Sequence, residues 1–557
     1  MNDYDVVQDP NELADYLPKV PLFRWIQGLA EPNEALILTV CSNLVQVGDA
    51  AYDLGSRLFS GNDQIVRALP AYLEKAKGKV SVSYREYRIL GYDGDIPEEY
   101  TDPVQHLKVL KKSVDFKQRG LYLSDSGRLM LNPNIFAKFV LNRISLVEVP
   151  GQGYYTYLSS GKWEGLDEDD LGRICRDFLH QAEANIWRSS WHREYLSAIS
   201  LEVPKIEQMD ANMEYINVQN GMLHLHSMEL IPHAPEFYST VQISTKYVPE
   251  ATCPKFLQFL DQVFEGDQER IKVIQEILGY SITKDMRMQK AFLMVGKGAN
   301  GKSVLAEIMR LVAGTENVSN VSLSRLSERF GLDALPGKVL NISTENELGD
   351  KYLNTESFKA ITGSDVVNVE QKFKTSFSCR LYCKLVILLN KLPKTTDFSH
   401  GYYRRLTIIP FNRIIAEHEQ NKNLVEELSA ELEGILTFAL EGYQRLLRQD
   451  FQLTKSKAID DALKSYKDEQ NPVLIFLREN LTSNPDSRVK RSLLFPAFER
   501  WCRRHGFERV SRARFWDLFR ASEVEFGKEF VQKKIQGDFY IGGVELATLE
   551  EEDFFSI

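Results

Sequence analysis

The hydrophobic pattern is clearest in the middle of the chain, where short apolar runs alternate with amphipathic stretches. Ala291 to Val295 is a continuous apolar run, the pattern expected of a strand buried on both faces of a parallel sheet. From Ser303 to Val312 apolar residues recur at helical spacing, and Gly314 predicts the end of that helix. Further strands are predicted at 338–343, 384–389 and 406–411. The sequence therefore predicts an α/β fold class for this region.

Weaker patterns lie on both sides of this region. A tight turn in residues 154–163 predicts a hairpin, and residues 217–226 predict a second turn and strand. Residues 256–282 predict two helices that lead into the first buried strand. Within the first 125 residues we predict short helices at 22–29 and 65–76, and the alternation from Val80 to Leu90 predicts a strand.

A glycine-containing loop joins the first buried strand to its helix. Gly296, Gly301, Lys302 and Ser303 satisfy the spacing G-x-x-x-x-G-K-[ST] within GKGANGKS. Glycine lets successive backbone N–H groups converge on phosphate oxygens at the positive end of the following helix. The sequence therefore predicts that ATP and Mg²⁺ bind at this loop. The predicted binding residues are Gly296, Lys297, Gly298, Ala299, Asn300, Gly301, Lys302 and Ser303.

Polar residues follow the later strands. Glu345 and Glu347 come after the strand at 338–343, where a carboxylate would orient Mg²⁺ and the attacking water. Asn390 ends the strand at 384–389, and an amide at this point can contact the γ-phosphate or the water. Arg404 and Arg405 precede the last strand, and one such arginine can stabilise the γ-phosphate held by a neighbouring subunit.

Composition and charge narrow the class of protein. The chain has 557 residues, of which 43% are hydrophobic and 26% charged, which is ordinary for several globular domains. The net charge of −10 argues against a uniformly basic surface that coats nucleic acid. Scattered cysteines, the absence of a signal-peptide pattern and the absence of a long apolar run predict a cytoplasmic protein without a membrane span.

Positive charge is concentrated near the end of the chain. Residues 478–534 contain fourteen Lys and Arg against eight Asp and Glu. Two helices are predicted at 493–504 and 511–519, with Arg512 and Arg514 on the second, and 532–544 predicts a hairpin. A solvated basic face is the alternative, but this arrangement favours contact with duplex or forked DNA.

Three smaller signals favour structural roles. Asp93 and Asp95 form a D-x-D that a primase could use to hold metals, but the S-x-H it needs occurs only at Ser190 and His192, in a predicted helix. His224 with His226, and Cys379 with Cys383, are pairs without a third ligand nearby in the sequence. We therefore interpret these pairs as strand residues.

Five motifs in order over about 120 residues resemble superfamily 3 helicases of the phage and plasmid primase-helicase type, related to the helicase half of poxvirus primase-helicases. The motifs are GKGANGKS, ISTENE, FKAITGSDVVNVEQKFK, LVILLNKLP and GYYRRLTIIPF. The resemblance extends over residues 130–546, and residues 1–125 resemble no family that we identify.

The resemblance implies an AAA+-like P-loop ATPase core, a mostly helical N-terminal region and a C-terminal winged helix. It implies a hexamer with ATP between subunits and single-stranded DNA in the pore, and unwinding in the 3′ to 5′ direction. Lys302 and Ser303 would serve phosphate and Mg²⁺, Glu345 hydrolysis, Asn390 sensing, and Arg404 or Arg405 the next subunit. The middle motif would supply Lys359, Gly363, Asp365 and Lys372, with Lys372 or Lys374 on a hairpin that grips DNA. Many nucleotide hydrolases carry an acidic pair where this chain has Thr344 and Glu345, so Glu345 is favoured over Glu347 without being fixed.

These expectations divide the chain into an N-terminal domain of unknown role (1–125), an α+β domain (126–250), the helicase ATPase domain (251–450) and a winged helix (455–557). The predicted function is ATP-dependent DNA unwinding during replication of a phage, plasmid or other mobile element. Two alternatives stay open, namely a primase-helicase or initiator with N-terminal priming or recruiting activity, and a DNA-remodelling ring that does not unwind. The predicted partners are single-stranded and forked DNA, further copies of the chain, and a primase or polymerase.

Overall fold

The computed structural model describes residues 13–95, 102–344, 353, 355–370, 372, 376–395, 397, 399–505, 507, 510–522, 532–535 and 538–546. The chain divides into two compact units, Met1–Met209 and Asp210–Ile557. Each unit combines helices with sheets, and the second contains a parallel sheet, so the α/β class predicted from the sequence is confirmed at this level.

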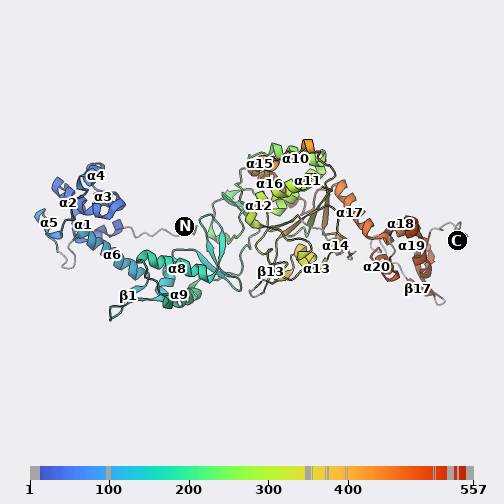
Figure 1. Cartoon of the computed structure of the whole chain (residues 1–557), viewed down its shortest axis with the longest axis horizontal. Coiled ribbons are helices and arrows are strands. Elements are labelled where there is room, and N and C mark those ends of the chain that lie inside the picture. Colours follow the sequence, from blue (N-terminus) through green and yellow to red (C-terminus); the bar gives the residue numbers. More distant parts are fainter. Residues whose placement is uncertain are drawn as a thin grey trace. The chain divides into compact units, whose positions relative to one another are not determined.

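The first unit begins with helices and continues with small antiparallel sheets (Figure 1). Its helices are η1 (Leu13–Lys19), α1 (Pro21–Gln27), α2 (Glu34–Leu44), η2 (Val45–Ala50), α3 (Ala51–Leu58), α4 (Asp63–Ala76), α5 (Tyr84–Ile89), α6 (Pro103–Gln118), α7 (Pro133–Leu141), α8 (Glu168–Ala182) and α9 (Ser189–Glu202). Its strands are β1 (Leu121–Leu123), β2 (Leu129–Leu131), β3 (Leu146–Val149), β4 (Gly153–Tyr157) and β5 (Trp163–Leu166). The hairpin of β4 and β5 confirms the one predicted there.

The predicted strand at Val80 to Leu90 is wrong, because this stretch contains helix α5. Ser83 and Glu86 form a capping box, in which the backbone N–H of Ser83 donates to Glu86 Oε2 at 2.6 Å. Local hydrogen bonding at the helix start thus overrides a short alternating pattern. Asp93 and Asp95 therefore follow a helix and not a strand.

One apolar stretch of this unit, Glu34–Leu58, is long and apolar enough to cross a membrane by length and composition alone. It is not one regular helix, because Gly48 has φ 63° and ψ −129° between α2 and α3. Leu36, Val40 and Leu54 on it are buried in the core that residues 14–107 share. The stretch therefore packs as core helices of this unit.

The second unit begins with an antiparallel sheet of β6 (Tyr215–Val218), β7 (Gly221–His224) and β8 (Leu230–Ile231), followed by η3 (Pro235–Phe237). Its central sheet has the order β10 (Val318–Ser319), β11 (Leu340–Ser343), β14 (Lys384–Leu389), β9 (Ala291–Val295) and β15 (Leu406–Pro410), with every pair parallel. Strands β9 and β14 coincide with the predicted apolar runs, which confirms these two elements.

Helices cover both faces of the central sheet, because alternate strand residues point to opposite sides. Phe292 and Met294 of β9 pack with α10 (Pro254–Phe264), α11 (Gln268–Ser281), α12 (Lys302–Ala313) and α16 (Leu432–Arg448). Ala291 and Leu293 pack with α13 (Thr355–Gly363), α14 (His400–Tyr403), α17 (Lys457–Gln470) and the hairpin of β12 (Val366–Val369) and β13 (Phe377–Arg380). Figure 1 shows this sheet between its helices. The remaining elements of this region are η4 (Thr315–Asn317), η5 (Arg325–Ser327), η6 (Glu417–Glu419) and α15 (Leu424–Ser429).

Helix α17 is bonded to the loop that follows β14. Tyr466 Oη donates to the carbonyl oxygen of Pro393 at 2.7 Å, and the N–H of Thr395 donates to Gln470 Oε1 at 3.1 Å. Tyr402 and Tyr466 also share a hydrogen bond of 3.3 Å between their hydroxyls. The first two bonds attach α17 to the loop after β14, and the third attaches it to α14.

The last part of the unit has its own core. It contains α18 (Pro472–Asn480), β16 (Leu481–Lys490), α19 (Arg491–His505), α20 (Arg512–Ser522), β17 (Gln532–Ile535) and β18 (Asp538–Leu546). The strands form an antiparallel sheet in the order β16, β18, β17. Phe498, Trp501 and Phe515 are buried beneath it. The two predicted helices and the hairpin strands are therefore present in this region.

Candidate nucleotide site

The loop between β9 and α12 requires glycine at two positions. A Cβ on Gly296 would lie 2.2 Å from Asn300 Nδ2 and 2.5 Å from the carbonyl oxygen of Phe411. Gly301, the residue before the first turn of α12, has φ 82°, and a Cβ there would lie 2.6 Å from Val263 Cγ2. Side chains are excluded at both positions, so the loop stays close to β15 and α10 while its backbone turns into α12.

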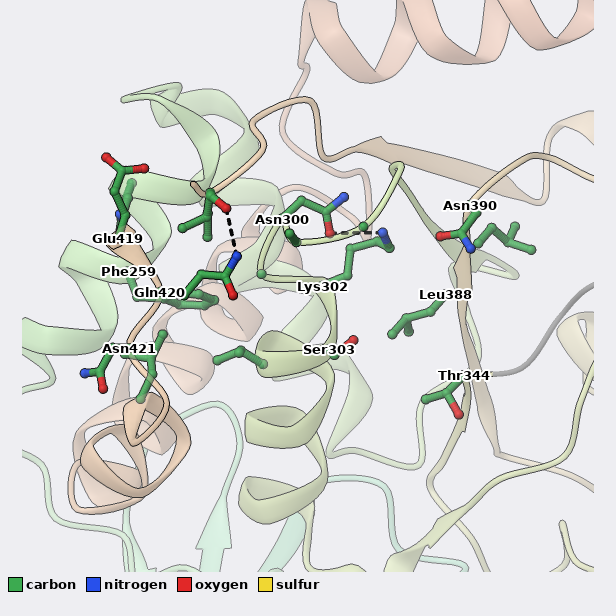
Figure 2. Close-up of a pocket in the computed structure, with 18 of the residues that line it drawn as sticks. Phe259, Asn300, Lys302, Ser303, Thr344, Leu388, Asn390, Glu419, Gln420 and Asn421 are labelled. Carbon is green, nitrogen blue, oxygen red and sulfur yellow. Dashed lines mark hydrogen bonds between the residues drawn. The ribbon is translucent and has the colours of Figure 1, made fainter. Parts of the chain in front are cut away.

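Lys302, the first residue of α12, directs its ammonium back into the loop. Its Nζ donates to the carbonyl oxygen of Gly296 at 2.6 Å. It also donates to Asn300 Oδ1 at 3.0 Å, as Figure 2 shows. Asn300 in turn donates from Nδ2 to the carbonyl oxygen of Phe411 at 3.4 Å. Burial lowers the pKa of Lys302, because a charged ammonium loses water there and gains no carboxylate from the residues that the structure describes. The arrangement supplies a cation that an anionic ligand could pair with.

Strand pairing brings Asn390 and Thr344 to the same edge as this loop. The N–H of Gly296 donates to the carbonyl oxygen of Leu389 at 3.1 Å, so Asn390 lies directly beside the start of the loop. Thr344 follows β11, whose last residue pairs with Ile387 of β14. Figure 2 shows Lys302, Ser303, Asn390 and Thr344 around one hollow. The structure thus brings together seven of the predicted site residues, namely Gly298, Ala299, Asn300, Gly301, Lys302, Ser303 and Asn390.

Glu345 and Glu347, the two carboxylates considered for hydrolysis, lie outside the described residues. Their described neighbour is Thr344, which lines the hollow. The role predicted for Glu345 therefore stays a prediction, and with it the contribution of Glu345 to a Mg²⁺ site beside Ser303.

The hollow is a cavity of about 1280 Å³. Four parts of the chain line it: the loop and the start of α12, the ends of β11 and β14, one face of α10, and the segment that leads into α15. The lining residues are Lys255, Gln258, Phe259, Gln262, Gly298, Ala299, Asn300, Gly301, Lys302, Ser303, Val304, Thr344, Leu388, Leu389, Asn390, Lys391, Leu392, Pro393, Lys394, Ile415, Glu419, Gln420, Asn421, Leu424 and Glu427. Volumes of roughly 300 to 1,000 Å³ are usual for small-molecule sites, so the cavity can hold a nucleotide.

The wall far from Asn390 was not predicted from the sequence. Phe259 on α10 lies buried below Gly301, and the N–H of Ile415 donates to the carbonyl oxygen of Ala299 at 2.7 Å. Gln420 Nε2 donates to the carbonyl oxygen of Ile415 at 3.0 Å, and Figure 2 shows its side chain directed toward the cavity. These residues belong to no motif, and only the fold brings them to the loop.

Arg404 and Arg405 lie at the opposite edge of the sheet. The N–H of Ala291, the first residue of β9, donates to the carbonyl oxygen of Arg405 at 2.7 Å. At roughly 3.3 Å per residue, the five residues of β9 separate this edge from the loop by about 15 Å. A ligand phosphate beside Lys302 is therefore out of reach of these two arginines in the same chain.

The amino edge collects positive charge. Arg404 Nη2 donates to Gln289 Oε1 at 2.8 Å, and Arg405 Nη1 donates to the carbonyl oxygen of Gly401 at 2.5 Å. Arg405 Nε is buried and has no hydrogen-bond partner among the described residues. Burial and then the charge of Arg404 lower the pKa of both Lys290 and Arg405. The positive charges of this cluster could therefore bind an anionic group.

The hairpin of β12 and β13 carries Lys372 at its tip, where this residue is exposed, whereas Lys374 lies outside the described residues. Lys359 of the same motif forms an ion pair with Asp397 Oδ2. Burial opposes ionisation of Asp397, but hydrogen bonds from Lys359 and Ser399 lower its pKa to about 2. Lys359 therefore fixes the loop after β14.

Arg512 and Arg514 both lie on α20, where Ser511 Oγ accepts from the N–H of Arg514 at 3.2 Å. Arg512 is exposed, and Arg514 is half-buried. Both are remote in sequence from the nucleotide cavity and line no part of it.

Among the described residues, no group of three or more His, Cys, Asp or Glu lies close enough to hold a metal ion. His224 Nδ1 shares a hydrogen bond of 2.7 Å with Ser227 Oγ, and Cys383 is buried directly before β14. His192 of the S-x-H lies on α9, with Nδ1 2.9 Å from Tyr195 Oη. His224 and Cys379 lie in β7 and β13, whereas His226 and Cys383, which were also predicted to be strand residues, lie outside the strands.

Two families match parts of the chain. Residues 142–265 match the family described as D5 N terminal like, and residues 294–405 match a family of unknown function, DUF5906. The second match spans the loop after β9 and ends at Arg405.

Two of the curated relatives are viral proteins. The protein of Acanthamoeba polyphaga mimivirus named as helicase L207/L206 is 24% identical over 240 residues, which are 40% of this chain. The protein of Frog virus 3 (isolate Goorha) named as helicase 022R is 21% identical over 262 residues, which are 42% of this chain. The chain spans about a quarter of the length of these relatives, 24% and 26% respectively.

Among solved structures, the A form of the apo NrS-1 C terminal region aligns with 74% of this chain and 100% of its own, at a TM-score of 0.44 and 16% identity. The family matches and the viral relatives confirm the resemblance to superfamily 3 primase-helicases of phages and viruses.

Proposed function

We propose that the protein is an ATP-dependent DNA helicase that unwinds duplex DNA during replication of a phage, plasmid or other mobile element. The observation that carries the proposal is the meeting of Lys302, Ser303 and Asn390 at the mouth of one large cavity. The viral relatives named as helicases support the same activity.

The loop residues fit a nucleoside triphosphate with Mg²⁺. A Cβ on Gly296 or Gly301 would clash with neighbouring atoms, so the turn of the backbone needs glycine at both positions, and N–H groups at the start of α12 are suited to phosphate oxygens. Lys302 would pair with the β- and γ-phosphates, and Ser303 Oγ would hold Mg²⁺, which when bound neutralises phosphate charge. Glu345 would orient the attacking water, and Asn390 would contact it or the γ-phosphate.

The position of the arginines supports a ring of identical subunits. Arg404 and Arg405 lie one strand length away from Lys302 in the same chain, so they can serve a phosphate only across a subunit boundary. A head-to-tail interface would place the amino edge of one copy against the cavity of the next and would close as a ring, here a hexamer. The Nε of Arg405, which is buried and has no hydrogen-bond partner among the residues that the structure describes, suits that role.

DNA would be contacted at two places. Lys372 and Lys374 near the tip of the β12–β13 hairpin would hold the phosphate backbone of one strand in the pore. The helices and hairpin strands after residue 455 would form a winged helix, and Arg512 and Arg514 on α20 would contact the fork. Residues 126–250 and 251–450 would be the domain before the motor and the motor itself, and residues 1–125 would recruit a partner such as a primase or polymerase.

The test is steady-state ATP hydrolysis with and without single-stranded DNA, together with strand displacement on a forked duplex, for the parent and Lys302→Ala. We expect DNA-stimulated turnover in the parent and a loss of about 10²- to 10³-fold in the variant, because the variant lacks the cation at the phosphate oxygens. Lys272→Ala, an exposed lysine of α11 that does not line the cavity, is the matched control.

ATP binding without turnover or strand displacement on any forked substrate would refute the proposal. Turnover without displacement would instead assign the protein to DNA-remodelling ATPases. Nucleotide incorporation on a single-stranded template that is lost in Asp93→Ala would show that the N-terminal unit also has primase activity.

A further inference from the structure

A second, smaller cavity lies in the C-terminal part of the chain, away from the nucleotide loop. Its volume is about 470 Å³, and it is lined by Arg491, Ser492, Arg512, Ala513, Trp516, Asp538 and Phe539. These residues come from the first turns of α19 and α20 and from the start of β18, which Figure 1 places at the red end of the ribbon together with β17. We call this cavity the aromatic notch.

Two aromatic rings form part of its walls. Trp516 is half-buried, and it packs edge-on against the buried rings of Phe515 and Phe519 at centroid distances of 4.9 and 5.2 Å. Phe539 is 47% exposed, which is unusual for a phenylalanine in a packed domain. The indole N–H of Trp516 donates no hydrogen bond to any residue that the structure describes. Both rings therefore present apolar surface to the notch.

The charges at the notch are mostly positive. The guanidinium carbon of Arg491 lies 4.2 Å from the centroid of the Trp516 ring, and Arg512 is exposed at the rim. Lys534 is paired with Phe539 in the ladder of β17 and β18, and its Nζ lies 5.7 Å from that ring. Asp538, the acidic residue among those that line the notch, is bonded to Lys490 at 2.6 Å. An anionic partner therefore meets cations beside aromatic surfaces.

Aromatic rings next to Arg and Lys are suited to a chain that carries both flat rings and phosphates. Unpaired bases stack on such rings while the neighbouring cations contact the phosphodiester oxygens. The bases of a duplex are stacked on one another and cannot present their faces to Trp516 or Phe539. An acidic peptide would satisfy the cations but would leave the two rings without a flat partner.

We propose that the aromatic notch binds an unpaired base of single-stranded DNA, with the base against Trp516 and Phe539 and the phosphates on Arg491 and Arg512. The proposal rests on the proposed DNA helicase function and deepens it, because it adds a site for the separated strand outside the ring. The duplex at the fork would then be contacted by the exposed cations of this region, and the freed strand by the notch.

The experiment measures binding by the full chain carrying Lys302→Ala, so that nucleotide turnover plays no part. The probe is a fluorescent oligothymidylate, compared with a blunt duplex of the same length, and binding is followed by anisotropy. We expect Phe539→Ala to weaken binding of the single strand by roughly 5- to 100-fold, the range for loss of one stacked base, and to leave duplex binding within about twofold.

Controls separate stacking from charge and from folding. Leu493→Ala removes an exposed apolar residue of α19, 56% accessible, that does not line the notch, and binding should not change. Arg512→Ala should weaken single-strand binding and reduce the slope of log affinity against log salt by about one, whereas Phe539→Ala should leave that slope unchanged. Trp516→Leu should repeat the effect of Phe539→Ala, with circular dichroism to verify its folding.

Photocross-linking with a 5-iododeoxyuridine oligonucleotide locates the base directly. Cross-links in the peptides that contain Trp516 or Phe539 would support the proposal. Equal losses for single strand and duplex in Phe539→Ala, or unchanged affinity with cross-links elsewhere, would overturn it. Tighter binding of oligouridylate RNA than of DNA would overturn the choice of DNA. Because every arm lacks ATP turnover, none of these outcomes depends on whether the helicase function holds.

Discussion

The two edges of the central sheet each bury a lysine, but the two lysines differ in what surrounds them. Lys302 at the carboxyl edge donates to the Gly296 carbonyl and to Asn300, and it lines a large cavity. Lys384 at the amino edge has no exposed surface, and its Nζ donates to the carbonyl oxygens of Thr283 and Tyr382 beside the ring of Tyr280. One ammonium can reach a ligand and the other cannot.

The difference shows that burial of a charge alone does not identify a site. Burial lowers the pKa of Lys384 to about 7, against a smaller opposing effect of Asp285, and it also lowers the pKa of Lys302. The larger perturbation belongs to the lysine that is closed off from every cavity described here. The cavity and the neighbouring strand ends, and not the size of the shift, are the reasons for proposing Lys302 rather than Lys384 as the phosphate ligand.

The largest effect is expected when the two edges are inactivated in different copies. Lys302→Ala and Arg405→Ala should each reduce ATP turnover by about 10²- to 10³-fold. If the amino edge serves the cavity of the next copy, equal mixing should restore about a quarter of the parental turnover, because a quarter of head-to-tail interfaces combine both intact residues. Turnover is measured after the subunits have been mixed and allowed to exchange.

The same mixing experiment is repeated with Arg404→Ala in place of Arg405→Ala. The comparison shows which of the two arginines serves the cavity of the next copy. A mixture that recovers no turnover, although subunit exchange is demonstrated by fluorescence, would contradict action across a subunit boundary.

A second comparison replaces each lysine by methionine. Lys384→Met should leave ATP turnover within about twofold and raise the melting temperature at neutral pH, because a buried charge without a carboxylate partner is replaced by an apolar side chain of similar length. The gain should be on the order of a few kcal/mol in the free energy of unfolding. Lys302→Met should abolish turnover and change stability less.

The pH dependence of stability checks the cause. In the unfolded chain Lys384 binds a proton below its ordinary pKa of 10.5, and in the folded chain only below about 7. Between these values the unfolded state binds more protons, so this lysine makes stability rise with pH across that window. The rise between pH 7.5 and 9.5 should be smaller in Lys384→Met than in the parent, as measured by scanning calorimetry. Identical slopes would show that Lys384 is charged in the folded protein over the whole window.

The smallest effect is expected at the far wall of the cavity. Gln420→Ala removes one hydrogen bond to Ile415 and part of the wall, a change of about 0.5 to 1.5 kcal/mol. The KM for ATP should rise about two- to tenfold while kcat stays constant, because this wall contacts the part of the nucleotide that does not react. Lys422→Ala, an exposed change in the same segment, should leave both constants unchanged. A fall in kcat for Gln420→Ala would place this residue nearer the phosphates.

The sequence predicts the central strands and the loop well because their signals are local. A parallel strand buried on both faces is a continuous apolar run, as at Ala291–Val295. The glycines of the loop are required because a Cβ at their positions would clash with neighbouring atoms, including atoms only a few residues away. Asn390 follows from the same logic, since it ends such a run. The strand predicted at Val80 to Leu90 fails because a capping box at Ser83 is a stronger local signal than five alternating positions.

Other parts of the site depend on contacts between distant segments. Phe259 and Gln420 reach the loop from sequence positions more than forty and more than one hundred residues away, and neither carries a pattern of its own. From its charge and its place at the start of a strand, Lys384 is expected to be exposed, but it is fully buried. The aromatic notch likewise joins the starts of two helices and a strand. Such groupings are set by packing and register, which a single sequence does not display.

The hydrogen bonds between α17 and the loop after β14 would transmit any movement of that loop to α17. Asn390 and Pro393 are three residues apart, and Tyr466 on α17 is bonded to Pro393 at 2.7 Å. A shift of this loop during ATP hydrolysis would therefore pull on α17 without first deforming the sheet. Helix α17 leads directly into α18 and the C-terminal basic region. Each cycle of ATP hydrolysis would therefore move the part of the chain that is proposed to hold the fork.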